Sequence, residues 1–335
     1  MSVMQECVQD NDDILQVENI CKYYKASSGK LFDKTVFKAV NQVSFSVKRG
    51  ETFGLVGESG CGKSTLAKLV MKLMEASGGK VIFDGENILE YDKQKMKQKR
   101  SDMQIIFQDP YSSLNPRMTV SQSIAAPLLI QGVYKANEKD KIQKKVDEMM
   151  DLVGLAKRFA NSYPHELDGG RRQRIGIARA LSLNPKFIVC DEPVSALDVS
   201  IQAQVLNLMQ DLQEQMGLTY IFITHDLSVV NHFADDIAVM YLGQLIEKAP
   251  SEQLFDKPTH PYTQALLSAI PVPSLKKRRE RIILKGEITS PINPKPGCRF
   301  AARCPYATDR CRSEEPVLRE IEPNHFVACH LTEGK

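Results

Sequence analysis

A glycine-rich segment in the first fifth of the chain has the residue types that bind phosphate. Residues 57–65 read GESGCGKST and match the pattern G-x4-G-K-S. The glycines allow successive backbone N–H groups to converge on phosphate oxygens, and the N-terminus of a following helix adds positive potential. We expect Lys63 to reach the terminal phosphates and Ser64 to ligate Mg²⁺. The segment predicts a P-loop with candidate contacts at Gly57, Ser59, Gly60, Cys61, Gly62, Lys63, Ser64 and Thr65.

Two adjacent acids end an apolar run about 130 residues further along the chain. Residues 187–192 read FIVCDE, which predicts a buried strand that delivers Asp191 and Glu192 to its carboxyl end. Ligands of open α/β sheets bind at that end. We expect Asp191 to hold Mg²⁺ and Glu192 to polarise the attacking water in phosphoryl transfer.

Two further polar residues follow apolar runs in the same way. Gln108 comes after residues 105–107, and His225 comes after residues 221–224. Both are candidate sensors of a γ-phosphate. A single Gln or His at a strand end is more often a surface residue, so both assignments depend on the complete set of motifs.

The periodicity of apolar residues places these motifs on an alternating series of strands and helices. A helix is expected after the P-loop, from residue 66 to 74, and another from a cap at Asn137 to Gly154. Such alternation favours a mainly parallel α/β sheet. Prolines become frequent beyond Pro250, which predicts a boundary near Ala249. The expected strands cover residues 14–17, 39–47, 52–56, 187–190, 220–223 and 237–240.

The order of the motifs closely resembles that of the nucleotide-binding subunit of ATP-binding cassette (ABC) transporters. The resemblance covers residues 14 to 250 and adds a signature region, LDGGR at 167–171, and a D-loop, SALD at 195–198. It implies a P-loop NTPase fold with a RecA-like mainly parallel sheet, an N-terminal antiparallel β subdomain and a helical signature subdomain.

The resemblance also implies roles for individual residues. Lys63, Glu192 and His225 would be catalytic, and Ser64, Gln108 and Asp191 would hold Mg²⁺. Tyr24 would stack on adenine, with neighbouring Tyr23 as the alternative. In the family two subunits enclose two ATP molecules, each P-loop facing the other subunit's signature. The residues implied to complete the partner's nucleotide site are Asp168, Gly169, Gly170 and Asp198.

Three further motifs resemble the branch of this family that imports oligopeptides, dipeptides and nickel. They are FQDP at 107–110, SLNPR at 113–117 and PTHPYT at 258–263. Membership in that branch implies a complex with two membrane permeases, a second ATP-binding subunit that is often a different chain, and an external substrate-binding protein. Peptide is the expected substrate, with nickel or a metal chelate second. The expected domains are 14–250 and a C-terminal extension, 251–335.

Composition excludes several other classes of protein. The chain has 335 residues with 44 Lys+Arg against 41 Asp+Glu, so its formal charge is 44 − 41 = +3, which gives no nucleic-acid-binding signature. The run at 124–130 is far shorter than the ~18 apolar residues that cross a bilayer. We therefore expect a cytoplasmic chain that does not span a membrane, and the resemblance implies a peripheral place on the cytoplasmic face of the membrane. A non-transport ABC ATPase acting on nucleic acid is disfavoured, whereas a binding-only regulatory cassette stays open.

Four of the eight cysteines lie in the last forty residues. Their spacing, C-x5-C-x6-C-x17-C, lacks the C-x2-C or C-x4-C pairs of most structural zinc sites. The resemblance to the importer branch, some members of which carry a [4Fe-4S] cluster, makes that cluster the first expectation, with zinc second and unliganded thiols third. The proposed ligands are Cys298, Cys304, Cys311 and Cys329.

The signature departs from the family pattern Leu-Ser-Gly-Gly-Gln. Asp168 replaces the serine and Arg171 replaces the glutamine. A carboxylate facing the γ-phosphate at ~4 Å would cost about 4 kcal/mol per pair of charges at an effective dielectric constant of about 20. Arg171 could offset this cost, or Asp168 could serve as a helix N-cap. The departure leads to the hypothesis of an asymmetric transporter in which only the ATP on this chain's own P-loop is hydrolysed efficiently.

Overall fold

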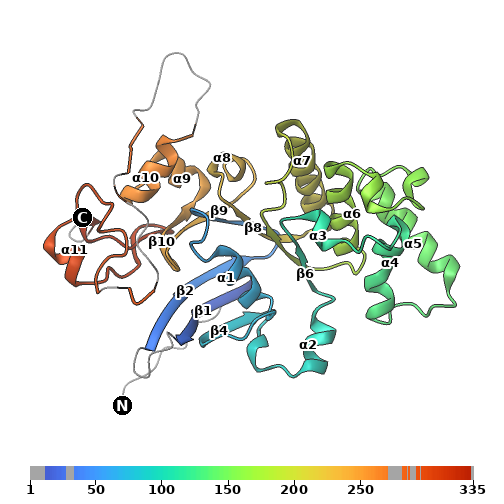
Figure 1. Ribbon diagram of the computed structural model, residues 1–335, viewed down its shortest axis with the longest axis horizontal. Coiled ribbons are helices and arrows are strands. Elements are labelled where there is room, and N and C mark those ends of the chain that lie inside the picture. Colours follow the sequence, from blue (N-terminus) through green and yellow to red (C-terminus); the bar gives the residue numbers. More distant parts are fainter. Residues whose placement is uncertain are drawn as a thin grey trace.

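The computed structural model describes residues 12–27, 34–270, 281–284, 286, 292–294 and 296–332. Within these residues the strands form two sheets, and the larger has the order β11-β12-β10-β9-β3-β8-β7-β6. Figure 1 shows the helices α3 to α6 at one end of the molecule and the C-terminal segments with α10 and α11 at the other. None of the described helices is both long enough and apolar enough to cross a membrane.

The centre of the larger sheet is parallel. Its strands are β3 (Thr52–Val56), β6 (Met103–Ile106), β7 (Phe187–Asp191), β8 (Thr219–Thr224) and β9 (Asp236–Tyr241), and β3 pairs in parallel with both β8 and β9. Every residue of β3, β7 and β8 is buried, which explains their continuous apolar sequences, because both faces of the sheet are covered. Strands β3, β6, β7 and β8, which lead to the four motifs, therefore present their carboxyl ends at one edge of the sheet.

The smaller sheet is antiparallel and lies beside α1 (Figure 1). Its strands are β2 (Lys34–Lys48), β1 (Asp13–Ser27), β4 (Gly78–Phe83) and β5 (Glu86–Asn87). Phe45 of β2 stacks on Phe53 of β3 at 4.7 Å, and Phe83 of β4 packs against Phe187 of β7 at 5.7 Å. These contacts, with apolar residues of α1 (Lys63–Val70), join the smaller sheet to one face of the larger one.

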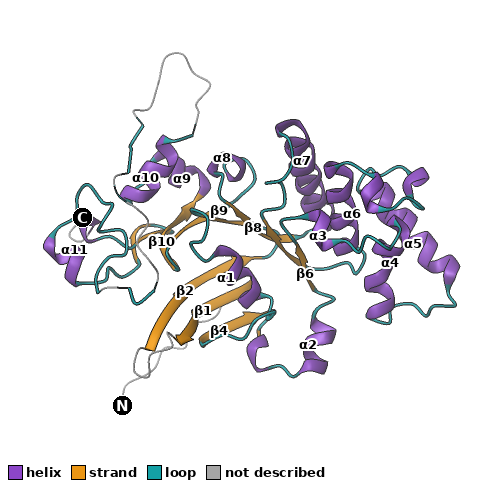
Figure 2. Cartoon of the chain, in the orientation of Figure 1, coloured by secondary structure: helices purple, strands orange, loops and turns teal. Residues whose placement is uncertain are grey.

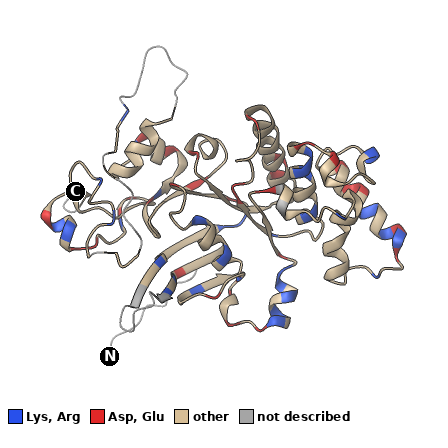
Figure 3. Cartoon of the chain, viewed as in Figure 1, with Lys and Arg blue, Asp and Glu red and all other residues tan. Residues whose placement is uncertain are grey.

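Helices cover the opposite face of the larger sheet (Figure 2). Met149 and Met150 of α5 are buried in this layer together with residues of α4, α6 and α7. Apart from α1, the α-helices of the described residues are α2 (Lys93–Lys99), which packs with the smaller sheet through Met96, α3 (Pro110–Ser113), α4 (Val120–Ile130), α5 (Lys139–Leu152), α6 (Gly169–Leu181), α7 (Val199–Met216), α8 (Leu227–Val230), α9 (Ser251–Asp256), α10 (Pro261–Ser268) and α11 (Asp309–Ser313). Basic and acidic residues are interspersed along α5 and α11, whereas α3, α4, α8 and α10 carry no Lys, Arg, Asp or Glu (Figure 3).

Two helix ends differ from the expected ones. The helix after the P-loop ends at Val70, because Lys72 adopts a left-handed backbone with φ +46°, so Leu73 and Met74 do not continue it. The later helix begins at Lys139 rather than after Asn137. There the Glu138 carboxylate accepts the backbone N–H of Lys135, which closes a turn just before the helix.

The C-terminal part is connected to the main sheet through β10 (Gln244–Pro250). Strand β12 (His325–Val327) pairs antiparallel with β10, and β11 (Arg319–Glu322) pairs with β12. The fully buried carboxylate of Glu247 accepts the N–H groups of Thr259 and His260 and lies 2.8 Å from Nε2 of His325. The division into domains near Ala249 stays a prediction. In the structure, β10 is shared by the sheet and the C-terminal strands.

Candidate nucleotide-binding site

The P-loop connects β3 to α1 in a backbone conformation that needs glycine. Gly57 has φ +156° and Gly62 φ +110°, and an added Cβ would lie 2.2 Å from the carbonyl oxygen of Met240 or 2.3 Å from that of Ala39. Lys63 is buried, and its Nζ donates to the carbonyl oxygens of Gly57 and Glu58 at 2.7 and 3.1 Å. The loop is therefore closely packed and held partly by its own lysine.

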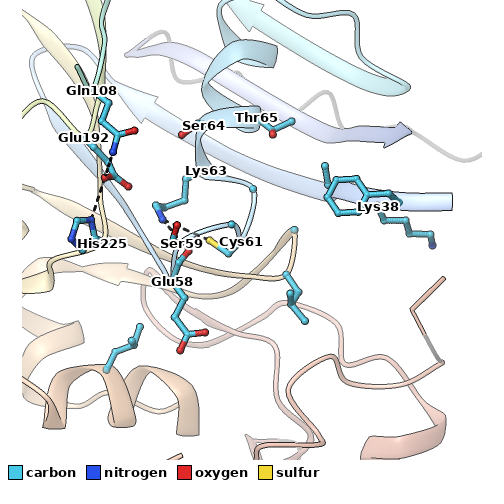
Figure 4. A pocket seen from close by; sticks show the side chains of 17 residues that line it. Lys38, Glu58, Ser59, Cys61, Lys63, Ser64, Thr65, Gln108, Glu192 and His225 are labelled. Atoms are coloured by element: carbon cyan, nitrogen blue, oxygen red, sulfur yellow. Dashed lines mark hydrogen bonds and ion pairs between the residues drawn. The ribbon is translucent and has the colours of Figure 1, made fainter. Parts of the chain in front are cut away.

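A cleft of about 770 Å³ opens over this loop (Figure 4). Eight consecutive loop residues, three polar residues that follow strands of the sheet and several apolar side chains surround it. The lining residues are Phe37, Lys38, Ala39, Glu58, Ser59, Gly60, Cys61, Gly62, Lys63, Ser64, Thr65, Gln108, Glu192, His225, Leu242, Gly243 and Leu266. The cleft therefore brings the P-loop residues after Gly57 together with Gln108, Glu192 and His225, whereas Gly57 and Asp191 do not line it.

Asp191 and Ser64 form an oxygen pair at the floor of the site. The Ser64 hydroxyl donates to Oδ1 of Asp191 at 2.9 Å, which joins the start of α1 to the end of β7. Burial raises the pKa of Asp191, the Ser64 hydrogen bond lowers it, and the adjacent Glu192 carboxylate raises it. Hydroxyl and carboxylate oxygens are the ligands that Mg²⁺ prefers, so this pair fits the ion.

Glu192 is the centre of a three-residue group at the strand ends. Gln108 Nε2 donates to Oε2 of Glu192 at 2.9 Å, and Nδ1 of His225 lies 3.2 Å from the same oxygen (Figure 4). Glu192 has φ +49°, so its backbone turns out of the strand direction immediately after β7. Both contacts reach Oε2, and within the described part of the chain no hydrogen bond is formed to Oε1, which can therefore orient a water molecule.

The structure distinguishes the two tyrosines considered for adenine stacking. The hydroxyl of Tyr23 donates to Oδ1 of Asn41 at 2.7 Å, whereas Tyr24 is exposed, with its ring 5.8 Å from that of Phe37. Tyr24 does not line the cleft, and Phe37 does. Stacking by Tyr24 stays a prediction, and Phe37 is an aromatic neighbour that the motif search did not find.

The signature and D-loop residues lie outside this cleft. Asp168 caps α6 by accepting the N–H of Arg171 at 2.8 Å, and its other oxygen pairs with the Arg171 guanidinium at 2.6 Å. Gly169 and Gly170 begin α6, and Asp198 caps α7. Their roles in nucleotide contact therefore require a second chain and stay proposals.

The prediction of a metal centre at the four C-terminal cysteines is wrong. Among the described residues, no group of three or more His, Cys, Asp or Glu side chains is placed to hold a metal ion.

The thiols belong instead to the packing of the C-terminal part. Cys298 and Cys304 pack against the apolar core, and Cys311 is buried with its Sγ 3.3 Å from the Thr308 hydroxyl. Burial raises the pKa of Cys298 to about 11 and also raises the pKa of Cys304 and Cys329, which favours protonated thiols. Neither the iron–sulfur cluster nor the zinc ion is supported.

Comparison with known proteins identifies the family. Residues 40–195 match the family model described as ABC transporter, and residues 246–311 match the model described as oligopeptide/dipeptide transporter, C-terminal region. The oligopeptide transport ATP-binding protein AppF of Bacillus subtilis is 50% identical over 96% of this chain and 98% of its own length. The chain belongs to the ATP-binding subunits of ABC transporters.

Other members of this family agree with the assignment. The dipeptide transport ATP-binding protein DppF of Haemophilus influenzae is 49% identical over 96% of this chain and 98% of its own length. A dimeric ATP-binding cassette in a post-hydrolysis state, bound to ADP and phosphate, has a TM-score of 0.63 and 28% identity, and it covers 71% of this chain and 98% of its own. The predicted fold class is therefore confirmed, and ATP as the nucleotide fits membership in this family.

Proposed function

We propose that this ABC subunit hydrolyses ATP to energise the import of di- or oligopeptides through separate membrane permeases. The observation that carries the proposal is the match, over nearly the whole chain, to transport proteins named for oligopeptides and dipeptides. The C-terminal match to an oligopeptide/dipeptide transporter model supports the same substrate class.

The geometry of the site supports ATP hydrolysis as the reaction. Bound Mg²⁺ would supply charge neutralisation between the phosphates. The oxygens of Ser64 and Asp191 would hold it, and Lys63 would neutralise the terminal phosphates. Glu192, oriented by Gln108 and His225, would accept a proton from the attacking water through its free oxygen. The chain's own contribution is therefore to position charges and one water molecule.

The proposed complex contains two permeases, a second ATP-binding subunit that is a different chain, and an extracellular substrate-binding protein. This chain would be peripheral, on the cytoplasmic face of the membrane. The dimeric structures of related cassettes support pairing with a second ATP-binding subunit. Pairing would also give the signature residues at the start of α6 a nucleotide to contact.

Reconstitution in vesicles tests the proposal. The complex would be assembled from this chain and the permeases, partner ATPase and binding protein encoded beside it, and the uptake of labelled tetrapeptide and of nickel measured with and without ATP. We expect ATP-dependent peptide uptake that is lost with Glu192→Gln in a complex whose partner ATPase carries the equivalent change. Nickel uptake without peptide uptake would refute the substrate class, and ATP binding without hydrolysis would favour the regulatory cassette.

A further inference from the structure

Glu58 is an acidic residue inside the phosphate-binding loop. It follows Gly57, and its carbonyl oxygen accepts the Lys63 ammonium group at 3.1 Å. A carboxylate in this position repels phosphate unless a cation neutralises it. In Figure 4 its side chain leaves the loop on the side away from Gln108. The partners that hold it there come from the C-terminal part of the chain.

The Arg303 guanidinium forms a bidentate ion pair with the Glu58 carboxylate. Its Nη1 and Nη2 donate to the two carboxylate oxygens at 2.9 and 3.1 Å. Only 9% of the Arg303 side chain and 27% of the Glu58 side chain are exposed, so solvent screens the pair much less than it screens a surface pair. A planar guanidinium that binds both oxygens of a carboxylate fixes its orientation as well as its charge.

Tyr262 holds the backbone of the same residue. The Glu58 N–H donates to the Tyr262 hydroxyl at 3.0 Å. The Tyr262 ring is fully buried and makes edge contacts with Tyr241 at 4.7 Å and with Phe300 at 5.4 Å. Arg303 also lies over the Tyr241 ring, at 5.9 Å. The two groups that hold Glu58 therefore belong to one packed aromatic cluster.

We propose that Arg303 and Tyr262 are positioning residues for nucleotide binding, which act from the C-terminal part of the chain by holding Glu58 and so fixing the start of the phosphate-binding loop. The inference rests on the proposed ATP site. It assigns to the C-terminal part a direct role in nucleotide affinity, through three contacts to one loop residue. Arg303 does not line the cleft, so its effect passes through Glu58.

Nucleotide affinity of the full-length chain tests this proposal. The dissociation constant for ATP with Mg²⁺ would be measured by calorimetry for the wild type, Arg303→Ala, Arg303→Lys and Tyr262→Phe. We expect Arg303→Ala to raise it about three- to tenfold and Tyr262→Phe about two- to threefold. Arg303→Lys should lose less ATP affinity than Arg303→Ala, because lysine keeps the positive charge but not the bidentate geometry.

The matched control is Arg312→Ala. Arg312 lies in the same C-terminal part and also pairs with a carboxylate, that of Asp309, but its side chain is 63% exposed and its ion pair does not involve the phosphate-binding loop. We expect this variant to bind ATP as the wild type does. Circular dichroism would confirm that each variant is folded, and if Arg303→Ala does not fold, Tyr262→Phe and Arg303→Lys decide the question.

Two further readouts distinguish positioning from general destabilisation. Glu58→Ala and the double variant Glu58→Ala/Arg303→Ala should have equal affinities, because Arg303 acts only through Glu58. In the assembled complex, Arg303→Ala should raise the KM for ATP while kcat at saturating ATP stays within about twofold.

Unchanged affinity in folded Arg303→Ala, or additive effects in the double variant, would overturn the inference. A wild-type chain that binds no ATP would instead refute the proposed function.

Discussion

Lys63 and Glu192 occupy different positions in the site, so substitutions at the two residues should affect different steps, ATP binding and ATP hydrolysis. Lys63 contacts the P-loop carbonyls beneath the phosphate position, whereas Glu192 stands at the strand end with Gln108 and His225. We expect Glu192→Gln to keep ATP affinity and slow hydrolysis about 10²- to 10⁴-fold. Lys63→Ala should weaken ATP binding about tenfold or more, because a charge facing the phosphates is lost.

Equilibrium ATP binding and single-turnover hydrolysis measure these two effects separately. The complex needs a partner ATPase with the change equivalent to Glu192→Gln, so that only this chain's P-loop turns over. Equal losses of affinity in the Lys63 and Glu192 variants would show that the two roles are misassigned.

Asp168 and Arg171, the two residues that depart from the family signature, form an ion pair within this chain, so each partly neutralises the charge of the other. Both carboxylate oxygens of Asp168 are engaged by Arg171, one by its backbone N–H and one by its guanidinium. The Arg171 guanidinium also lies 4.8 Å from the Phe159 ring centre. The N-cap role is thus present in the structure, and the charge on Asp168 is partly neutralised but still carried at the start of α6.

Restoring the family residues tests the hypothesis of asymmetry. In a complex with a different partner chain, Glu192→Gln would abolish hydrolysis of the ATP on this chain's P-loop. The remaining turnover would then measure hydrolysis of the ATP on the partner's P-loop. Asp168→Ser with Arg171→Gln should then raise turnover about tenfold, because a repulsion of order 1 kcal/mol or more is removed while serine keeps the cap. No increase would refute the asymmetry.

At the scale of secondary-structure elements, Asp84 ties the antiparallel sheet to the larger one. It follows β4 and pairs with Arg49, with Lys186 at 3.1 Å and with Lys99 at 3.6 Å. The Arg49 hydrogen bond is the main reason that the pKa of Asp84 falls to about 2. Its φ of +52° is one that asparagine also tolerates, so Asp84→Asn removes the charge without new backbone strain.

We expect Asp84→Asn to lower the free energy of unfolding by about 1 kcal/mol at pH 7, a value reduced for solvent screening. The wild-type advantage is present above the ordinary carboxyl pKa near 4. It should shrink as the pH falls from about 4 towards 2, where Asp84 becomes protonated in the folded state as well. Urea unfolding of both proteins between pH 7 and 3 measures this, and a constant difference would contradict it.

His260, the N-cap of α10, is buried as a neutral side chain. Its Nδ1 accepts the N–H of Tyr262 at 3.1 Å, and burial lowers its pKa to about 4, although Glu247 partly opposes this shift. Between pH 6.5 and 4 the unfolded chain therefore binds a proton that the folded chain does not. This histidine should make the folded state less stable by up to ~1.4 kcal/mol for each pH unit as the pH falls through that range.

His260→Asn keeps a capping side chain and removes the titration. Its free energy of unfolding should depend less steeply on pH than that of the wild type between pH 6.5 and 4, by about one proton. His232→Asn, at an exposed histidine, is the matched control for the His-to-Asn substitution itself. Parallel curves for His260→Asn and the wild type would show that His260 is protonated in the folded protein.

At the scale of the whole molecule, the sequence predicted what local patterns determine. The apolar strands that lead to Gln108, Asp191 and His225 were recognisable, because each combines a continuous apolar run with a polar residue at its end. The end of α1 at Val70 was not, since the left-handed backbone of Lys72 just beyond it is fixed by tertiary packing. Cysteine spacing was misleading, because order along the chain does not report whether thiols converge on an ion or pack as apolar groups.

Contacts between distant segments were also beyond the reach of the sequence. No periodicity or motif links Glu58 to Arg303, which are 245 residues apart. The pairing of β12 with β10, and the burial of Glu247 between them, likewise depend on how the complete chain folds. Such contacts determine how the C-terminal part is connected to the nucleotide site.

The separation between Glu58 and Arg303 also imposes an order of events during protein synthesis. Ribosomes add about 5–20 residues per second, so Arg303 is made roughly 12–49 s after Glu58. All the motif residues from the P-loop to His225 are made before it. A nascent chain thus carries the full set of ATPase motifs while its loop carboxylate still lacks a counterion. If Arg303 positions Glu58 as proposed, full nucleotide affinity follows the synthesis of Arg303, and nascent chains that lack this residue should bind ATP more weakly.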